Sequence, residues 1–151
     1  MRLWQHLLKQ QVVAQSGYRY WRIFIQNNNG STYLAIDEIE LRSSIGGIDL
    51  TNPATPISAS VNSALAHYAI SNQLDLVWLS NQFETTNQWL RIDLNIPTSV
   101  KQIAIHPQSG DLASSPRNFI IQGSNDGTNF TDVKAFTDVT GWTNAWKTFD
   151  L

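Results

Sequence analysis

The stretch from Asn118 to Phe130 constrains the fold of this chain more than any other, because it encodes two strands joined by a tight turn. Its first half alternates polar and apolar residues, as a strand with one buried face does. The turn contains Asn125, Asp126 and Gly127, residue types that tolerate the positive φ angles of tight strand connections. The stretch therefore predicts an antiparallel β-hairpin.

Strand-like segments recur along the chain after Gly17, separated by turns rich in Gly, Asn, Ser and Pro. Residues 43–63 are irregular around one strand at 57–61, and residues 64–70 are predicted to form a short helical turn. Many short strands with frequent turns are typical of a β-sandwich or jelly roll, so we predict an all-β, jelly-roll β-sandwich. The other predicted strands are 18–25, 36–42, 88–94, 100–106, 117–123, 130–136 and 146–151.

The N-terminal segment has a different pattern from the rest of the chain. Its apolar residues recur at intervals of three and four, which places them on one face of a helix that ends at Ser16 and Gly17. We therefore divide the chain into an amphipathic helix at residues 1–16 and a single sandwich domain at 17–151. The apolar face of the helix comprises Leu3, Trp4, Leu7, Leu8 and Val12.

Polar residues within this segment argue against a signal peptide. They interrupt the apolar core that a signal peptide needs, and no convincing cleavage site of small residues follows. No run in the chain approaches the roughly 18 consecutive apolar residues of a membrane span. We therefore expect neither Sec export nor a membrane span. The interrupting residues are Gln5, His6, Lys9 and Gln10.

Composition and motif content exclude several classes of function. A net charge of −2 with 10 dispersed basic residues does not suit a binder of phosphate backbones, so nucleic acid is not an expected partner. Motifs of nucleophilic, metal-dependent or nucleotide-binding enzymes are absent, and we predict that the chain is not an enzyme. The absence of cysteine fits a reducing cytoplasm, an assembly completed there, or a sandwich that needs no disulfide.

Four motifs in the second half of the chain occur in an informative order. They are Ile57 to Ser60, the loop from Ala69 to Trp78, Gln88 to Leu94, and Gly123 to Gly127. Together they resemble the discoidin family, also called the coagulation factor 5/8 type C family. The resemblance implies a galactose-binding-like β-sandwich that binds glycans or lipid head groups through loops at one end, and it implies recognition rather than catalysis.

The closing motifs of that family stand first in this chain. They correspond here to Tyr18 to Ile23 and to Ala35 to Leu41, ahead of the four motifs above. The order predicts a circular permutation in which Leu151 ends near Tyr18 and residues 43–51 form the fused connection, as compact domains allow when their termini lie close together. One unit cut from a tandem array would give the same order. The rotated form resembles discoidin-like units of phage tails and virions.

The resemblance also assigns two groups of aromatic residues. Trp78 and Trp89 match tryptophans that pack inside the family's sandwich, so both are predicted core residues. The polar loop between them, with Asn81 and Phe83, corresponds to a binding spike in the family. An aromatic ring among amides suits sugar binding, because the ring contacts C–H groups while the amides bond hydroxyls.

Further candidate ligand contacts lie toward the C-terminus. His106, Asp111 and Arg117 flank a loop that resembles a ligand-facing segment of the family, in which such side chains bond sugar hydroxyls. A solvated loop with a structural arginine is the alternative. Trp142 stands beside Gly141 in a polar loop, where an exposed indole could stack on a sugar and a buried one could serve the core.

Relatives often hold a structural calcium, and this chain matches that site only in part. Glu38 matches the family's glutamate, but Ser71 and Asn72 replace the family's Asp and Gly. Asp75 could supply the missing carboxylate; otherwise the loop is free of metal, and no cofactor is required. Glu38 and Glu40 share a strand face, which does not give the opposed carboxylates of a glycosidase.

These observations predict a non-catalytic module that binds surface glycans and is displayed on a virion or another extracellular surface. The alternative is a structural virion subunit, in capsid decoration or the tail, that docks or oligomerises through Trp4, Leu7 and Leu8. Those side chains could also cover an edge of their own sandwich. A lipid-binding module would need apolar spikes ringed by basic residues, which Phe83 beside Glu84 does not provide.

Overall fold

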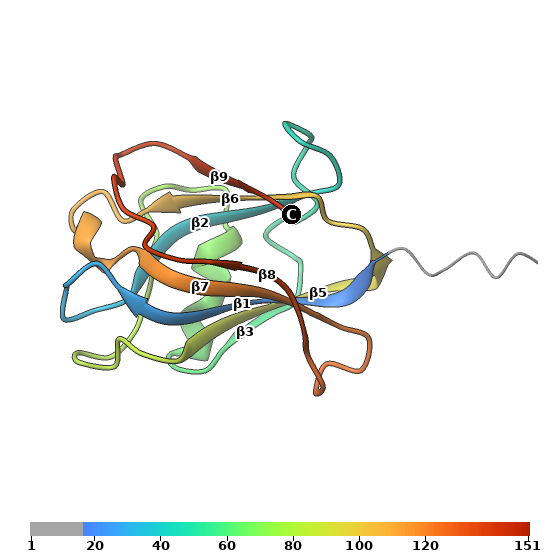
Figure 1. The fold of residues 1–151 in the computed structure, drawn as a ribbon, viewed down its shortest axis with the longest axis horizontal. Helices are drawn as coiled ribbons and strands as arrows, with labels where there is room; N and C mark the ends of the chain where they lie inside the picture. Colours follow the sequence, from blue (N-terminus) through green and yellow to red (C-terminus); the bar gives the residue numbers. More distant parts are fainter. Residues whose placement is uncertain (1–16) are drawn as a thin grey trace, which may run out of the picture.

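The computed structural model describes residues 17–151 and shows two antiparallel sheets packed face to face (Figure 1). One sheet has the strand order β3-β5-β1-β7-β8 and the other β4-β2-β6-β9. The predicted β-sandwich is therefore confirmed, whereas the predicted helix at 1–16 and its Trp4, Leu7 and Leu8 contacts lie outside the described residues. The strands are β1 (Tyr18–Asn28), β2 (Ala35–Arg42), β3 (Ile57–Ala59), β4 (Trp78–Leu79), β5 (Gln88–Thr98), β6 (Gln102–Pro107), β7 (Pro116–Ser124), β8 (Thr131–Phe136) and β9 (Lys147–Asp150).

The alternation of side chains along β1 and β5 separates the core from the outer face of the five-stranded sheet. On β1, Trp21 and Ile23 are buried, and on β5, Leu90 and Ile92 are buried. The residues that alternate with these buried ones along each strand point away from the core, because successive side chains of a strand lie on opposite faces. Trp89 is one of these and is only partly buried, so its predicted place in the core is wrong.

The core joins the inner faces of both sheets. Trp78 is fully buried and donates its indole N–H to the Val61 carbonyl at 3.1 Å. The 3₁₀ helix η1 (Ser63–Ile70), at the predicted helical turn, adds Ala66, Ala69 and Ile70 to the same core. No helix among residues 17–151 has the length and apolar character needed to cross a membrane.

The chain's C-terminus and the start of β1 lie at one end of the sandwich, which we call the terminal end (Figure 1). Tyr18 pairs with Thr98, and the Leu151 amide bonds the nearby Lys101 carbonyl at 2.9 Å. Tyr18 and Leu151 both pack against the hydrophobic core. This placement agrees with the predicted approach of the two ends, and the permutation itself stays a prediction.

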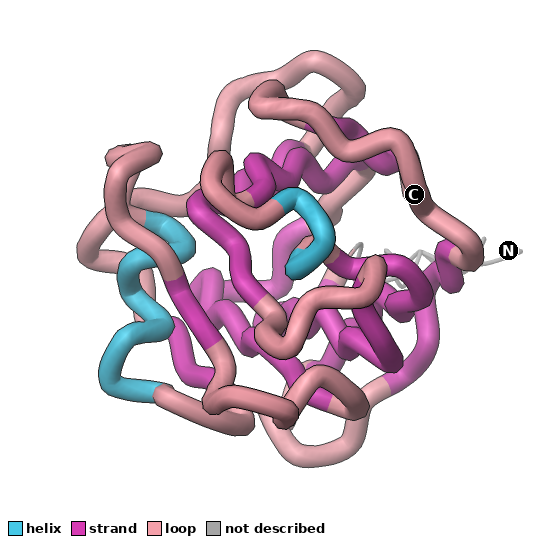
Figure 2. The backbone as a smooth tube through the Cα atoms, turned by 90° about the vertical axis from the view of Figure 1, so that its left-hand side faces the viewer, coloured by secondary structure: helices cyan, strands magenta, loops and turns pink. Residues whose placement is uncertain are grey.

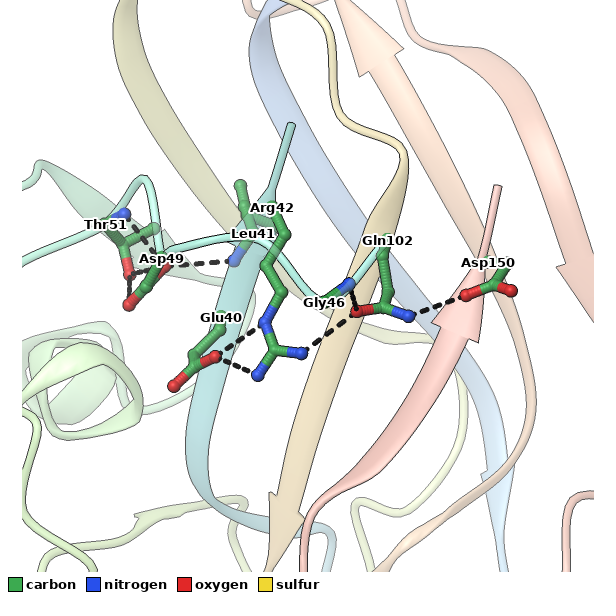
Figure 3. A network of polar contacts seen from close by, with 8 residues as sticks. All are labelled: Glu40, Leu41, Arg42, Gly46, Asp49, Thr51, Gln102 and Asp150. Atoms are coloured by element: carbon green, nitrogen blue, oxygen red, sulfur yellow. Dashed lines mark hydrogen bonds and ion pairs between the residues drawn. The ribbon is translucent and has the colours of Figure 1, made fainter. Parts of the chain in front are cut away.

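A polar network closes the terminal end beside the connection from β2 to β3 (Figure 3). Arg42 bonds Glu40 on its own strand and donates to the Gln102 side-chain oxygen at 2.9 Å. That oxygen also accepts the Gly46 amide at 3.0 Å, while the Gln102 amide donates to Asp150 at 2.7 Å. One glutamine therefore ties the connection to β2, β6 and β9.

Four connections gather at the opposite end, which we call the loop end. They join β1 to β2, β4 to β5, β6 to β7, and β8 to β9. Figure 2 looks onto this end and shows these loops in front of the strands. All predicted ligand residues, from Asn81 to Trp142, belong to these loops or to the strand ends that carry them.

Candidate functional site

Backbone hydrogen bonds hold three of the loops at the loop end together. The Asn29 amide bonds the Ala113 carbonyl at 3.0 Å, which joins the β1–β2 and β6–β7 connections. The Phe83 amide bonds the Thr32 carbonyl at 2.7 Å, which joins the β4–β5 and β1–β2 connections. The loops therefore form one hydrogen-bonded surface rather than independent segments.

Phe83 is the most unusual residue on this surface. Its side chain is 75% exposed, and its φ of 68° lies in the left-handed region. The other described non-glycine residues with positive φ are all Asn or Asp, which tolerate this conformation. A bulky residue held there marks backbone strain of the kind found at binding sites. The bond to Thr32 fixes the loop that presents the ring.

Polar groups surround the Phe83 ring within the same turn. The Asn81 side chain donates to the Glu84 carboxylate at 3.0 Å, and the Glu84 amide bonds the Asn81 carbonyl at 3.1 Å. Both residues are exposed, as is Gln82 between them. The turn thus offers an open aromatic face flanked by amides and one carboxylate, and ligand binding by Asn81 and Phe83 stays a prediction.

Asp111 belongs to this surface and connects two loops through hydrogen bonds. Its carboxylate accepts a hydrogen bond from the Ser31 hydroxyl, and its carbonyl accepts one from Ser114 at the short helix η2 (Leu112–Ser114). Asp111 is partly buried. The structure therefore brings Asp111 to the β1–β2 connection, which also carries Thr32 and so reaches Phe83.

His106 is held below the surface rather than on it. Its Nδ1 lies 3.0 Å from the Pro107 carbonyl and 3.6 Å from the Asp37 carboxylate, and its ring packs edge-on against Trp146. Burial raises the pKa of Asp37, although His106 opposes that rise. His106 is 5% exposed, so its geometry suits support of the loop end better than direct ligand contact.

Arg117 and Trp142 belong to the side of the loop end next to the β8–β9 connection. The exposed Arg117 side chain pairs with Asp138 at 3.1 Å. Trp142 is 7% exposed and donates its indole N–H to the Pro116 carbonyl at 3.1 Å. Its ring also packs 6.0 Å from that of Phe149. Of the two alternatives for Trp142, the structure therefore shows the buried indole that serves the core, and its place among the candidate ligand contacts is not supported.

Glu38, the residue that matches the family's calcium-binding glutamate, is a buried acid with a raised pKa. It is 1% exposed, and its Oε1 has no hydrogen-bond partner within residues 17–151. Its Oε2 accepts the Asn72 amide at 3.1 Å and the Ser71 hydroxyl at 3.4 Å. Burial raises the pKa of Glu38 to about 7, against the lowering effect of these bonds.

The donor set around Glu38 does not match the needs of calcium. Asp75 is exposed, and no hydrogen bond among residues 17–151 joins it to Glu38. The described chain also holds no group of three or more His, Cys, Asp or Glu side chains that could bind a metal. Calcium sites use several oxygens with charge among them, and this one offers a single buried carboxylate. A proton on Oε1 is the simpler way to satisfy that atom.

Sequence reasoning missed the contribution of the β1–β2 connection. Ser31 and Thr32 bond Asp111 and Phe83, so this connection organises the site. The signal available was the polar run from Gln26 to Ser31, whose composition by itself indicates only a turn. Asn81, Phe83 and Asp111 are brought together, whereas Arg117 and Trp142 lie beside a different connection.

Comparison with known families agrees with the sandwich and its loop end. A family model described as the NedA-like, galactose-binding domain, of the F5/8 type C group, matches residues 68–151, which is more than half of the chain. The chain belongs to this family. No curated protein and no solved structure matches the chain.

The galactose-binding-like match leaves β1 and β2 outside its limits, although both are integral to the fold. β1 is the central strand of the five-stranded sheet, and β2 lies between β4 and β6 in the other sheet. The matched segment therefore does not complete the sandwich without the preceding strands. The family resemblance predicted from the motifs is confirmed at the level of the family.

Proposed function

We propose that this chain is a carbohydrate-binding module and that Phe83 is the surface on which the sugar stacks. The observation that carries the proposal is an aromatic ring, 75% exposed, on a backbone held at a φ of 68° by a hydrogen bond to the next loop. Membership in the galactose-binding-like family points to the same class of ligand.

The chemistry around Phe83 suits a hexopyranose such as galactose. The axial hydroxyl of galactose leaves one ring face covered by C–H groups, and an exposed phenyl ring packs on such a face. The exposed amides of Asn81 and Gln82 and the carboxylate of Glu84 belong to the same turn and supply donors and acceptors for sugar hydroxyls. Because one ring and a few polar bonds bury little area, a single site binds weakly.

Display of several copies of the chain would raise the avidity of this weak binding for a surface that carries many glycans. Tethered sites raise the effective concentration of one another's ligand, which increases avidity without new contacts. A surface glycan in many copies is the partner that this arrangement favours. Presentation on a virion or a cell surface would satisfy the requirement.

We also infer that the strand order is a rotated form of the family's order. Three features support this inference: the closing motifs precede the others in sequence, the family match begins at residue 68, and the two ends of the described chain share the terminal end. Joining Leu151 to Tyr18 through a short linker and opening the chain within 43–51 should therefore give a folded protein.

A glycan array with the protein presented on multivalent beads tests the proposed function. We expect binding to galactose-terminated glycans that falls at least tenfold in Phe83→Ala, since the substitution removes the stacking surface. Ile48→Ala is the matched control, because Ile48 is an exposed apolar side chain in the β2–β3 connection, away from the loop end. Equal binding by Phe83→Ala, or no binding to any glycan by the parent protein, would overturn the proposal.

A further inference from the structure

The outer face of the five-stranded sheet carries a cluster of arginine and aromatic side chains away from the loop end. Tyr20, Arg22 and Phe24 point outward from β1, and Trp89 and Arg91 point outward from the neighbouring β5. With Phe130, which precedes β8, we call these residues the arginine face; each is partly buried. Such a surface differs from an ordinary solvated sheet face, where long charged side chains extend into water.

The two guanidinium groups of the arginine face both lie near Trp89, and Arg22 and Arg91 are direct partners across β1 and β5. The Arg22 guanidinium carbon is 5.9 Å from the Trp89 ring centroid, and that of Arg91 is 5.8 Å away. Arg22 also stacks on Phe130 at 3.8 Å, and Arg91 lies 6.0 Å from Tyr20. Cation–π contacts therefore fix both groups in place without neutralising their charge.

No carboxylate of the described residues forms an ion pair with either arginine. The nearby Asp93 is paired with Arg19 at 2.8 Å, and Asp132 accepts the Gln122 amide at 2.7 Å. Residues 1–16 contain no Asp or Glu, so they cannot supply a counterion. Burial and the positive charge of Arg91 both lower the pKa of Arg22. Asp132 opposes this lowering, and Arg91 helps to lower the pKa of Asp93. Two adjacent cations thus lie near carboxylates without a direct ion pair to any of them, on a protein whose net charge is −2.

Both arginines keep donors for a ligand. Within residues 17–151, Arg22 uses Nε to bond Gln122, which leaves its two terminal nitrogens. Arg91 bonds Ser58 through Nε and the Gly127 carbonyl through Nη1, which leaves Nη2. These bonds hold the guanidinium planes, and planar guanidinium groups match carboxylate and sulfate oxygens geometrically.

A pocket of about 230 Å³ adjoins Arg91 and suits the hydroxyl-bearing part of a ligand. The Asp93 carboxylate and the Ser58 hydroxyl can accept hydrogen bonds from hydroxyls, whereas a second anion there would be repelled by Asp93. A simple inorganic anion would leave this pocket unused. The pocket is lined by Tyr20, Pro56, Ile57, Ser58, Arg91 and Asp93.

We propose that the arginine face is a second binding site, specific for an acidic saccharide. The carboxylate or sulfate ester of the sugar pairs with the free guanidinium nitrogens of Arg22 and Arg91, and its ring packs against Trp89. The neighbouring hydroxyls enter the pocket at Ser58 and Asp93. This site uses none of the residues assigned to the loop end, so it stands independently of the function proposed for Phe83.

Titration with three hexasaccharides of equal length tests the proposal: chondroitin sulfate, unsulfated chondroitin, and neutral chitohexaose. We expect the parent protein to bind an acidic hexasaccharide. The affinity for that hexasaccharide should fall at least tenfold in Arg22→Gln and in Arg91→Gln. Lys101→Gln is the matched control, since it removes the same charge from an exposed side chain at the terminal end, and it should change affinity less than twofold. If unsulfated chondroitin binds, the sugar carboxylate is sufficient for recognition by the arginines. If only chondroitin sulfate binds, the arginines recognise the sulfate ester.

A further variant and a salt series keep the test decisive if a glutamine variant unfolds. Arg91→Lys retains the charge but loses the planar donor pair, so it should also weaken binding while preserving the melting temperature. Raising salt should weaken binding by the parent protein, because the contact is ionic. The proposal is overturned if no acidic hexasaccharide binds, if Lys101→Gln is as harmful as Arg91→Gln, or if polyglutamate binds equally well. Loss of binding in Phe83→Ala alone would assign the acidic sugar to the loop end instead.

Discussion

The loop end and the arginine face expose aromatic side chains in opposite ways. Phe83 is presented by a strained turn, and its neighbours are mostly uncharged amides. Trp89 lies on a regular strand, next to the guanidinium groups of Arg22 and Arg91. The difference teaches that a sandwich can present a ring either by straining a loop or by leaving one position of a strand outside the core. The first arrangement suits neutral sugars, and the second suits anionic ones.

The largest expected effect separates the inner from the outer tryptophan. Trp78→Ala should lower the free energy of unfolding by about 3–5 kcal/mol, because it empties a fully buried site. Trp89→Ala should lower it by only about 1 kcal/mol, since mainly cation–π contacts on the outer face are lost. Urea denaturation of both variants measures the difference. If both variants lose the same free energy of unfolding, Trp89 belongs to the core and the basis for the arginine face is removed.

A buried acid away from both regions should affect stability without affecting binding. The folded protein keeps a proton on Glu38 up to about pH 7, whereas the unfolded chain releases it near pH 4.5. The unfolding free energy should therefore fall as pH rises between these values, by about 2–3 kcal/mol from this group. Glu38→Gln, which is neutral throughout, should abolish that fall. Thermal melts of both proteins from pH 4 to pH 9 measure it.

Added calcium tests whether the Glu38 carboxylate binds a metal ion instead of a proton. Added calcium should leave the melting temperature at pH 8 unchanged, because the described residues offer one buried carboxylate there. If calcium raises the melting temperature of the parent protein but not that of Glu38→Gln, the Glu38 carboxylate binds the metal. Loss of that rise in Asp75→Asn as well would make Asp75 a second ligand.

A small gain in stability is expected from relieving the strain at Phe83. Phe83→Asn should raise the free energy of unfolding by about 1 kcal/mol, because asparagine tolerates the left-handed backbone that phenylalanine resists. Phe83→Ala should be nearly neutral, since it keeps the strain and removes a mostly exposed ring. Both variants should lose sugar binding. If Phe83→Asn is no more stable than Phe83→Ala, the turn is not strained and the contrast with the arginine face weakens.

The fold could be predicted because alternation and turn chemistry act locally. The hairpin at 118–130 appears as β7, a turn and β8, and the strand predicted at 88–94 lies within β5. The prediction for Trp89 followed the family resemblance, whereas the alternation of side chains along β5 places its ring on the outer face of the sheet. The apolar Leu90 and Ile92 imply outward positions for Trp89 and Arg91, which alternate with them along the same strand.

Residues of the candidate site could be predicted only where the polar composition of a loop correctly indicates that its aromatic side chain is exposed. Phe83 stands among polar residues and is exposed. Trp142 also stands among polar residues, but its loop folds back and buries it. Long-range folding of a loop leaves no local signal. The same limit hid the partnership of the β1–β2 connection with Asp111 and Phe83.

The most direct test of the central claim is an NMR titration of the full chain with a galactose-terminated oligosaccharide. We predict that the largest chemical-shift changes occur at Asn81, Phe83 and Glu84, with a smaller change at Thr32 through its bond to Phe83. The side-chain Nε–H signals of Arg22 and Arg91 should stay in place. Shifts that instead map to the arginine face, or the absence of shifts at the loop end at saturating sugar, would contradict the account.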